Sequence, residues 1–272
     1  MVTDTKEIQE LKFYLGIHNP ADTYRCSVPY FLSVRRVLHR KKPLYGDWIM
    51  DSGGFEELGL HGKYSFSEDD YIEAIKRLNP TFAFCQDWMV EPFILKKTGL
   101  TLEKHQEITI ESYLSMRSKC SNVLPVLQGQ TINDYIHHAN MYALSGVAMD
   151  GLFGVGSICR RQSSKDIFWI LSEIKRYYPD IKLHGFGVKI TAFKNHGVAS
   201  LLTSADSMAY KSDGWYKKAL NCPGCNKSNC VDCIKYALHW REKVLKYIAN
   251  NEDVIAIPMM PLEAEKKGES HE

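Results

Sequence analysis

The chain has 272 residues, of which 44% are hydrophobic, and this is enough for one large core in a single domain. Its formal net charge of +2 excludes a surface that is basic throughout, so any contact with a nucleic acid must be local. No run of eighteen apolar residues occurs, which argues against a membrane span.

Short apolar segments recur along the chain without clean alternation, as expected of strands that are buried on both faces. We predict strands around Phe13 and Phe31, ending at Asp51, Asp87, Gln128 and Gly156, ending near Gly187, and around Asp206. Amphipathic stretches predict helices over residues 67–78, 102–118, 131–145 and 164–178, the first with Ser67 as its N-cap. The alternation implies a parallel sheet, and about eight strands suggest an α/β fold closed into a (β/α)8 TIM-type barrel.

We expect residues 1–262 to form one domain, with a small zinc-binding subdomain over residues 220–240. Residues 263–272 are charged and have no apolar partner, which predicts a disordered tail. The polar, acidic N-terminus argues against a signal peptide, so we expect the protein in the cytoplasm.

Polar residues recur where the predicted strands end, at Asp51, Asp87, Gln128 and Asp206. Active sites of barrels are built at this end of the strands. A single Asp there is explained equally well as the N-cap of the next helix. Because the whole set converges on one face, we favour a functional site.

Two glycine-containing turns follow predicted strands. In the segment Asp51-Ser52-Gly53-Gly54-Phe55, two glycines allow the backbone to turn tightly and to approach a planar ligand. The segment around Gly156 has two interpretations: a bulge or close packing, or a backbone N–H that is offered to a carbonyl oxygen. It is not a dinucleotide-binding fingerprint, since the third glycine is missing.

Four of the eight cysteines form the motif CxxC-x4-CxxC, at Cys222, Cys225, Cys230 and Cys233. In a reducing compartment, clustered cysteines indicate a metal site before disulfides. Paired CxxC segments supply the four thiolates that a closed, structural Zn²⁺ site requires. His239 is an alternative ligand in place of one cysteine, although we favour a surface histidine on a helix, since four thiolates are already present.

Basic residues cluster over residues 35–42, with smaller pairs at residues 160–161 and 217–218. Such a run is usually a solvated helix face. Contact with phosphate, combined with base stacking, is the functional alternative. The aromatic residues near these segments are Tyr30, Phe31, Tyr210, Trp215 and Tyr216.

These features together resemble the tRNA-guanine transglycosylase superfamily: DSGGF after one strand, LQG after a later one, a Gly-rich strand end, and an Asp before a cysteine cluster. Several longer segments resemble the DpdA-type proteins of bacteriophages and bacteria, which install 7-deazaguanines in DNA. The segments that carry this resemblance are FYLGIHNP, VPYFLSVRR, GVGSICRR, HGFGVK, SADSMAY and CVDCIKYALHWREKVL, from about Phe13 to Leu245.

The resemblance implies a role for each matching position. Asp206 would be the nucleophile and Asp51 the general acid/base. Asp87 would bind the amidine edge of the base, while Gln128 and the N–H near Gly156 would hold its carbonyl oxygen. Ser52 and Gly53 would join them as substrate-binding residues.

Two carboxylates suffice for this chemistry without an organic cofactor. One captures the oxocarbenium-like centre at C1′, and the other protonates the leaving base and deprotonates the incoming one. The implied partners are DNA and a free 7-deazaguanine (preQ0-like) base, with Zn²⁺ as a structural cofactor. The implied location is the cytoplasm of a bacterial host if a phage encodes the protein, and a homodimer remains open.

Two departures from the tRNA enzymes stand out. The cysteine motif is not their CxC-x2-C plus His, and the chain ends soon after it, without room for an added RNA-binding domain. We therefore expect a DNA-guanine transglycosylase. The alternatives are a tRNA-guanine transglycosylase, a non-catalytic zinc-containing accessory subunit that binds nucleic acid, and a zinc-knuckle binder on an unrelated α/β scaffold.

Overall fold

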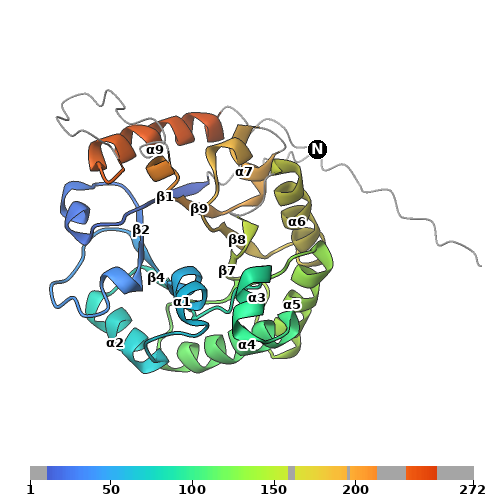
Figure 1. The fold of residues 1–272 in the computed structure, drawn as a ribbon. Helices are drawn as coiled ribbons and strands as arrows, with labels where there is room; N and C mark the ends of the chain where they lie inside the picture. Colours follow the sequence, from blue (N-terminus) through green and yellow to red (C-terminus); the bar gives the residue numbers. More distant parts are fainter. Residues whose placement is uncertain (1–10, 159–162, 195–196, 213–230, 250–272) are drawn as a thin grey trace, which may run out of the picture.

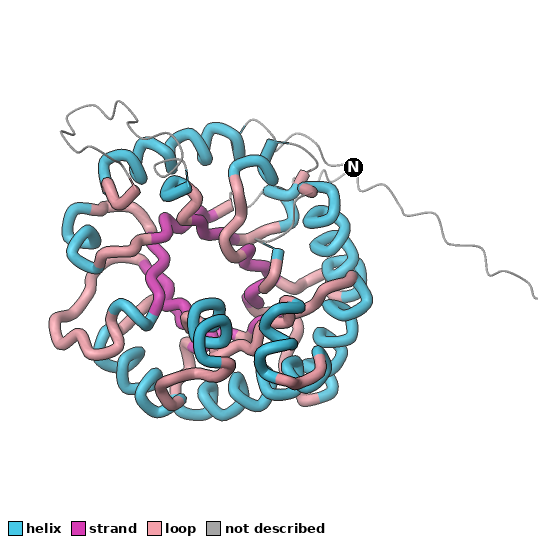
Figure 2. The backbone as a smooth tube through the Cα atoms, in the orientation of Figure 1, coloured by secondary structure: helices cyan, strands magenta, loops and turns pink. Residues whose placement is uncertain are grey.

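Nine short strands, all paired in parallel, form one sheet in the described part of the chain. The structure is a computed structural model, and it describes residues 11–158, 163–194, 197–212 and 231–249. The strands are β1 (Lys12–Gly16), β2 (Tyr30–Ser33), β3 (Trp48–Asp51), β4 (Phe82–Phe84), β5 (Val123–Leu124), β6 (Val126–Leu127), β7 (Leu152–Val155), β8 (Lys182–Gly185) and β9 (Ser204–Ser207). Their order across the sheet is β5-β4-β3-β2-β1-β9-β8-β7-β6. The strands form a ring, and helices surround it (Figure 2).

The two edges of this sheet meet in one segment of chain. Strands β5 and β6 are separated only by Pro125, which has no N–H with which to continue a strand ladder. Val123 pairs with Ala83 of β4, and Leu127 pairs with Val155 of β7. The segment therefore bridges β4 and β7, and the nine strands correspond to the predicted barrel with one strand broken at a proline.

The outer ring of the barrel consists of α2 (Glu68–Leu78), α4 (Leu102–Lys119), α5 (Ile132–Leu144), α6 (Ser164–Tyr177), α7 (Val198–Leu201) and α9 (Ile234–Ala249) (Figure 1). The four predicted helices are confirmed as α2, α4, α5 and α6. Ser67 is the N-cap of α2, as predicted: its Oγ accepts the N–H of Asp70, whose carboxylate accepts the N–H of Ser67.

Two of the helices that were not predicted follow the carboxyl ends of strands, where the site described below lies. Helix α1 (Gly54–His61) begins directly after β3, and α3 (Pro92–Thr98) follows β4. They contact each other in front of the ring in Figure 1. Short 3₁₀ turns, η1 (Pro20–Arg25), η2 (Val34–Arg36) and η4 (Ile190–Lys194), stand in several connections where a regular barrel would have a helix.

Helix α9 packs the end of the described chain against its beginning. The ring of Trp240 lies 6.1 Å from that of Phe13, and the Arg241 guanidinium donates to the Phe13 carbonyl at 3.1 Å. This helix therefore covers β1 and completes the outer layer. No helix in the described ranges is both long and apolar enough to cross a membrane.

Buried tyrosines hold the carboxyl ends of several strands in place. The hydroxyl of Tyr71 in α2 donates to the Phe84 carbonyl at 2.9 Å, and that of Tyr135 in α5 donates to the Gly156 carbonyl at 2.6 Å. A buried backbone carbonyl requires such a partner. These bonds fix the positions from which the side chains described below project.

Candidate active site

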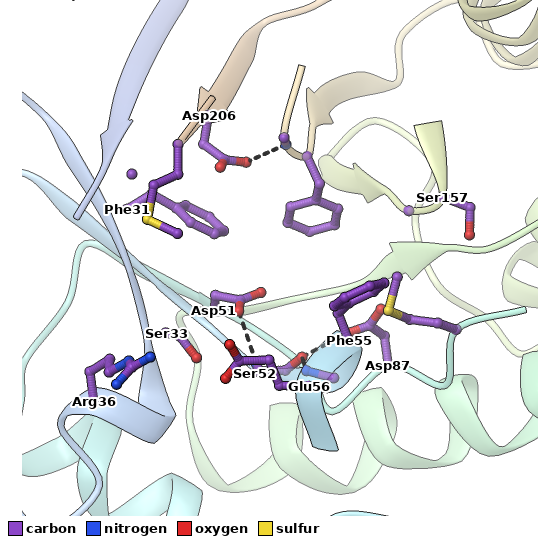
Figure 3. A pocket seen from close by; sticks show the side chains of 18 of the residues that line it. Phe31, Ser33, Arg36, Asp51, Ser52, Phe55, Glu56, Asp87, Ser157 and Asp206 are labelled. Carbon is purple, nitrogen blue, oxygen red and sulfur yellow. Dashed lines mark hydrogen bonds between the residues drawn. The ribbon is translucent and has the colours of Figure 1, made fainter. Parts of the chain in front are cut away.

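A cavity of about 360 Å³ opens at the carboxyl ends of the strands, within the range of small-molecule sites (roughly 300–1,000 Å³). All seven residues predicted as catalytic or substrate-binding line it: Asp51, Ser52, Gly53, Asp87, Gln128, Gly156 and Asp206. Figure 3 shows Asp206 facing Asp51 across the cavity, with Asp87 and Ser157 to one side. Residues far apart in the sequence therefore converge, as the barrel prediction required.

Asp51 ends β3 and is oriented by the turn that follows it. The N–H of Gly53 donates to Asp51 Oδ2 at 3.0 Å. Gly53 has φ +74°, and a Cβ there would lie 2.9 Å from Arg35 Cγ, so both backbone conformation and space require glycine. Gly53 thus positions a carboxylate.

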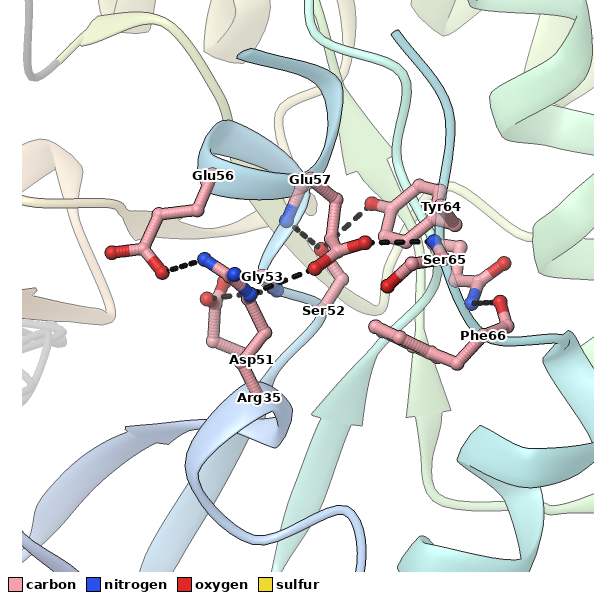
Figure 4. A network of polar contacts seen from close by, with 11 residues as sticks. Arg35, Asp51, Ser52, Gly53, Glu56, Glu57, Tyr64, Ser65 and Phe66 are labelled. Carbon is pink, nitrogen blue, oxygen red and sulfur yellow. Dashed lines mark hydrogen bonds and ion pairs between the residues drawn. The ribbon is translucent and has the colours of Figure 1, made fainter. Parts of the chain in front are cut away.

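Ion pairs brace this turn from behind (Figure 4). Arg35 contacts Glu56, and its Nε lies 2.7 Å from Glu57 Oε1. Glu57 is buried and also accepts the N–H of Ser65 at 2.7 Å. Arg35 therefore belongs to the scaffold of the site, which corrects its inclusion in a solvated or phosphate-binding basic run.

Burial raises the pKa of Asp51 to about 7, and the negative charges of Asp87 and Asp206 add to the shift. The N–H of Gly53 stabilises the carboxylate and opposes the shift only in part. A carboxyl group with a pKa near neutrality can both donate and accept a proton under physiological conditions. Burial of Asp51 beside two further acids in one cavity is the cause of this property.

Asp87, Ser52 and Gln128 form one buried chain of hydrogen bonds. Ser52 Oγ donates to Asp87 Oδ1 at 2.7 Å, and Gln128 Nε2 donates to Asp87 Oδ2 at 2.6 Å. Gln128 Oε1 in turn accepts the hydroxyl of Ser157 at 3.0 Å. Burial raises the pKa of Asp87, while the bonds from Ser52 and Gln128 oppose that rise.

Ser52 acts within this chain as a positioning residue. Its side chain is fully buried, and its Oγ also accepts the N–H of Gly54 at 3.2 Å. The Tyr64 hydroxyl lies 3.1 Å from the same Oγ and 2.9 Å from the Asp87 carbonyl oxygen. The Oγ of Ser52 is thus occupied by protein groups and supports Asp87, and the direct contact of Ser52 with a substrate stays a prediction.

Gly156 provides space for Gln128. Its own N–H donates to the Leu127 carbonyl at 2.9 Å in the strand ladder, so this N–H does not point to a ligand. A Cβ at Gly156 would lie 2.2 Å from Gln128 Nε2, which only glycine avoids. Close packing is therefore the correct interpretation of this glycine. The next N–H, of Ser157, belongs to a residue with φ +62° at the cavity wall.

One oxygen of Asp206 is held by the protein. Its Oδ1 accepts the N–H of Gly187 at 3.0 Å, and His184 Nε2 lies 3.3 Å from the same atom. His184 Nδ1 lies 2.8 Å from Ser204 Oγ, so the imidazole is fixed at both nitrogens. Within the described residues no donor contacts Oδ2, which leaves that atom for chemistry.

An aromatic cluster surrounds His184 and forms the floor beside Asp206. The ring of Phe31 stacks on His184 at 5.5 Å, and the rings of Phe84 and Phe186 lie 5.0 and 5.1 Å from it. Phe31 and Phe186 line the cavity. Only Phe31 was singled out from the sequence. Phe186 lies at the end of the strand that was predicted to end near Gly187, and this position is the signal that identifies it.

The other predicted nucleic-acid contacts divide into three groups. Arg36 lines the cavity. Tyr30 stacks on Trp48 at 5.8 Å, and the Tyr210 hydroxyl donates to the Gly16 carbonyl, so both tyrosines belong to the core and the prediction of base stacking by them is wrong. Of the remainder, His39, Arg40, Lys41 and Lys42 do not line the cavity, and six residues lie outside the described ranges: Arg160, Arg161, Trp215, Tyr216, Lys217 and Lys218.

Three of the four predicted zinc ligands, Cys222, Cys225 and Cys230, lie outside the described residues, as does the predicted tail. Cys233 is buried immediately before α9. His239 lies on α9, with Nδ1 3.7 Å from Glu242. The described ranges alone contain no group of three potential metal ligands.

The sequence model of one protein family, DpdA (DeoxyPurine in DNA protein A), matches residues 9–260 of the chain. Comparison with curated proteins yields no match.

Proposed function

Since the chain belongs to the DpdA family of DNA-modifying transglycosylases, we propose that it replaces guanine in DNA by a free 7-deazaguanine through a covalent aspartyl intermediate. One observation carries this proposal: Asp206, Asp51 and the Asp87–Gln128 pair line the same cavity. These groups supply a nucleophile, a proton donor and a surface for the edge of a base. The same convergence disfavours a non-catalytic accessory subunit.

The Asp87–Gln128 pair is complementary to the edge of guanine. Guanine presents N1–H and N2–H₂ donors beside the O6 acceptor, and each oxygen of Asp87 has a further lone pair to accept them. The second N–H of Gln128 Nε2 and the N–H of Ser157 would donate to O6 of the bound base. A 7-deazaguanine has the same edge, so one pocket serves both bases.

The two remaining carboxyl groups carry the reaction. Asp206 Oδ2 forms a bond to C1′ while the bond from C1′ to the guanine nitrogen breaks, and the electron pair of that bond leaves with the base. Asp51 donates its proton to the departing guanine. The resulting carboxylate of Asp51 removes a proton from the incoming base, whose nitrogen then displaces Asp206 from C1′. A base in duplex DNA must first flip out.

The experiment that tests this function supplies the full chain with a labelled 7-deazaguanine and with DNA or tRNA under matched conditions. We expect the label in DNA nucleosides and an equal release of guanine, measured by mass spectrometry. Label in tRNA but never in DNA would favour the tRNA-guanine alternative, and no label in either polymer would refute base exchange.

The same assay tests the base pocket. Asp87→Ala or Gln128→Ala should reduce exchange about ten- to hundredfold, because each leaves a buried partner unpaired at a cost of roughly 1–3 kcal/mol. Gln86→Ala is the matched control: this buried amide donates to the Phe66 carbonyl and does not line the cavity. An equal loss in the control would attribute the effect to folding.

The proposal includes one structural Zn²⁺ held by Cys222, Cys225, Cys230 and Cys233. Its support is the chemistry of the donor set, since four thiolates in two CxxC pairs suit a closed tetrahedral site. Removal of the metal should destabilise the fold, because metal binding is coupled to folding. Metal analysis that finds no zinc in the purified protein, or unchanged zinc content in a Cys222→Ala/Cys225→Ala variant, would refute it.

A further inference from the structure

The cavity changes in chemical character from one side to the other. Figure 3 places Asp87 and Ser157 on one side, Asp51 and Asp206 between, and Arg36 on the opposite side. If the base occupies the first side and C1′ lies between the two aspartates, the rest of the nucleotide must extend toward Arg36. This arrangement of base, sugar and remaining nucleotide follows from the proposed function. The proposed function assigns no protein residue to the backbone of the nucleic acid, and Arg36 lies where that backbone is expected.

Arg36 is the exposed end of η2, and it differs from its neighbour Arg35. Arg35 is bound to Glu56 and Glu57, whereas within the described residues Arg36 has no acidic partner. Arg36 lines the cavity together with Glu56, whose carboxylate pairs with Arg35. In a chain of net charge +2, a free guanidinium at the mouth of a cavity is a local feature that attracts anions.

His18 also lines the cavity. Burial lowers its pKa, and the positive charges of Lys211 and Arg36 lower it further, while the negative charges of Asp232 and Glu56 oppose the shift. Lys211 is paired with Asp232 at 2.8 Å. Arg36 is therefore the cation that lines the cavity without an acidic partner among the described residues, and His18 lines the same cavity with an imidazole N–H as a second donor.

We propose that Arg36, assisted by His18, binds a phosphodiester group adjacent to the target nucleotide in DNA. This inference rests on the proposed function. A guanidinium presents parallel N–H donors that match two phosphate oxygens, and such charge-assisted bonds are stronger than neutral ones. The contact carries no sequence information; it fixes the register of the strand so that C1′ lies between Asp51 and Asp206.

The test compares the full chain with Arg36→Gln on short single-stranded oligonucleotides that contain one guanine. The phosphodiester on the 5′ or 3′ side of that guanine is replaced, one at a time, by an uncharged methylphosphonate. With the natural oligonucleotide, Arg36→Gln should raise KM roughly tenfold and leave kcat near the parent value. The slope of log binding constant against log salt concentration should become shallower by about one, as expected for the loss of one phosphate contact.

The methylphosphonates separate a direct contact from a general loss of charge. At one of the two positions the methylphosphonate should raise the KM of the parent protein about as much as Arg36→Gln does. At that position it should cause no further rise in the KM of Arg36→Gln. The proposal would be overturned if the rises in KM caused by the methylphosphonate and by Arg36→Gln multiply at both positions. An unchanged KM in Arg36→Gln with the natural oligonucleotide would also overturn it. The matched control is Arg25→Gln, an exposed arginine on η1 that does not line the cavity and should behave as the parent.

Binding measurements keep this inference separate from the proposed function. If the parent exchanges no base, the same oligonucleotides and variants are compared by fluorescence anisotropy. The rises that are expected in KM, for each variant and each methylphosphonate position, should then be found in Kd. The absence of that pattern would refute the phosphate site, whether or not the chain is a transglycosylase.

Discussion

Replacing Asp206 with Asn should lower base exchange by a factor on the order of 10⁴ or more while DNA still binds, because a neutral amide cannot capture C1′. Asn keeps the shape of the side chain, and its Oδ1 can still accept the N–H of Gly187. The parent should form a covalent complex with an oligonucleotide once guanine leaves. The variant should form none, as measured on denaturing gels and by mass spectrometry of peptides.

The matched control for this substitution is Asp47→Asn. Asp47 precedes β3 at the opposite end of that strand, where it pairs with Lys12 and accepts the Thr81 hydroxyl, and it does not line the cavity. It should exchange bases at the parent rate. An adduct mapped to Asp51 would exchange the two roles, and an active Asp206→Asn variant would remove the double displacement altogether.

The convergence of the site was predictable because it depends on periodicity alone. Short apolar strands that alternate with helices give a parallel barrel, whose strands all end at one face. A polar residue at such an end, such as Asp51 or Gln128, must then lie near the others. The polar partner of each side chain was not predictable. That Gly156 donates to Leu127, and that Ser52 supports Asp87, depends on strand register and on side-chain rotamers.

The helices, too, divide into those that the sequence predicts and those that it does not. Those predicted begin at Ser67, Thr101, Thr131 and Ser163, and each of these side chains accepts a backbone N–H in the first turn. Helices α1 and α3 begin after Gly53 and Glu91, which make no such bond. The side-chain N-cap is thus missing at both helices, although Pro92 in the first turn of α3 is itself a signal of a helix start. Helices α1 and α3 contact each other.

The rate at which guanine is released should decrease as pH rises through about 7, roughly tenfold per unit, if Asp51 donates the proton. The direction follows from its pKa, which burial and the charges of Asp87 and Asp206 raise from 3.8 to about 7. Below that pH the group is protonated and can donate, and above it the group is a carboxylate. Single-turnover release of labelled guanine, between about pH 5 and about pH 9, measures this dependence.

Asp51→Asn should reduce release by roughly 10²–10⁴-fold and remove the decrease above neutral pH, because the amide does not titrate. Binding of DNA, measured over the same pH range, controls for titration of other groups near the cavity. A decrease that persists unchanged in Asp51→Asn would assign the ionisation to another residue. Asp206 supplies part of the negative charge that raises the pKa of Asp51. In Asp206→Asn the pKa of Asp51 should therefore fall, and a titration that follows this carboxyl group by NMR would detect the coupling between the two acids even where no reaction occurs.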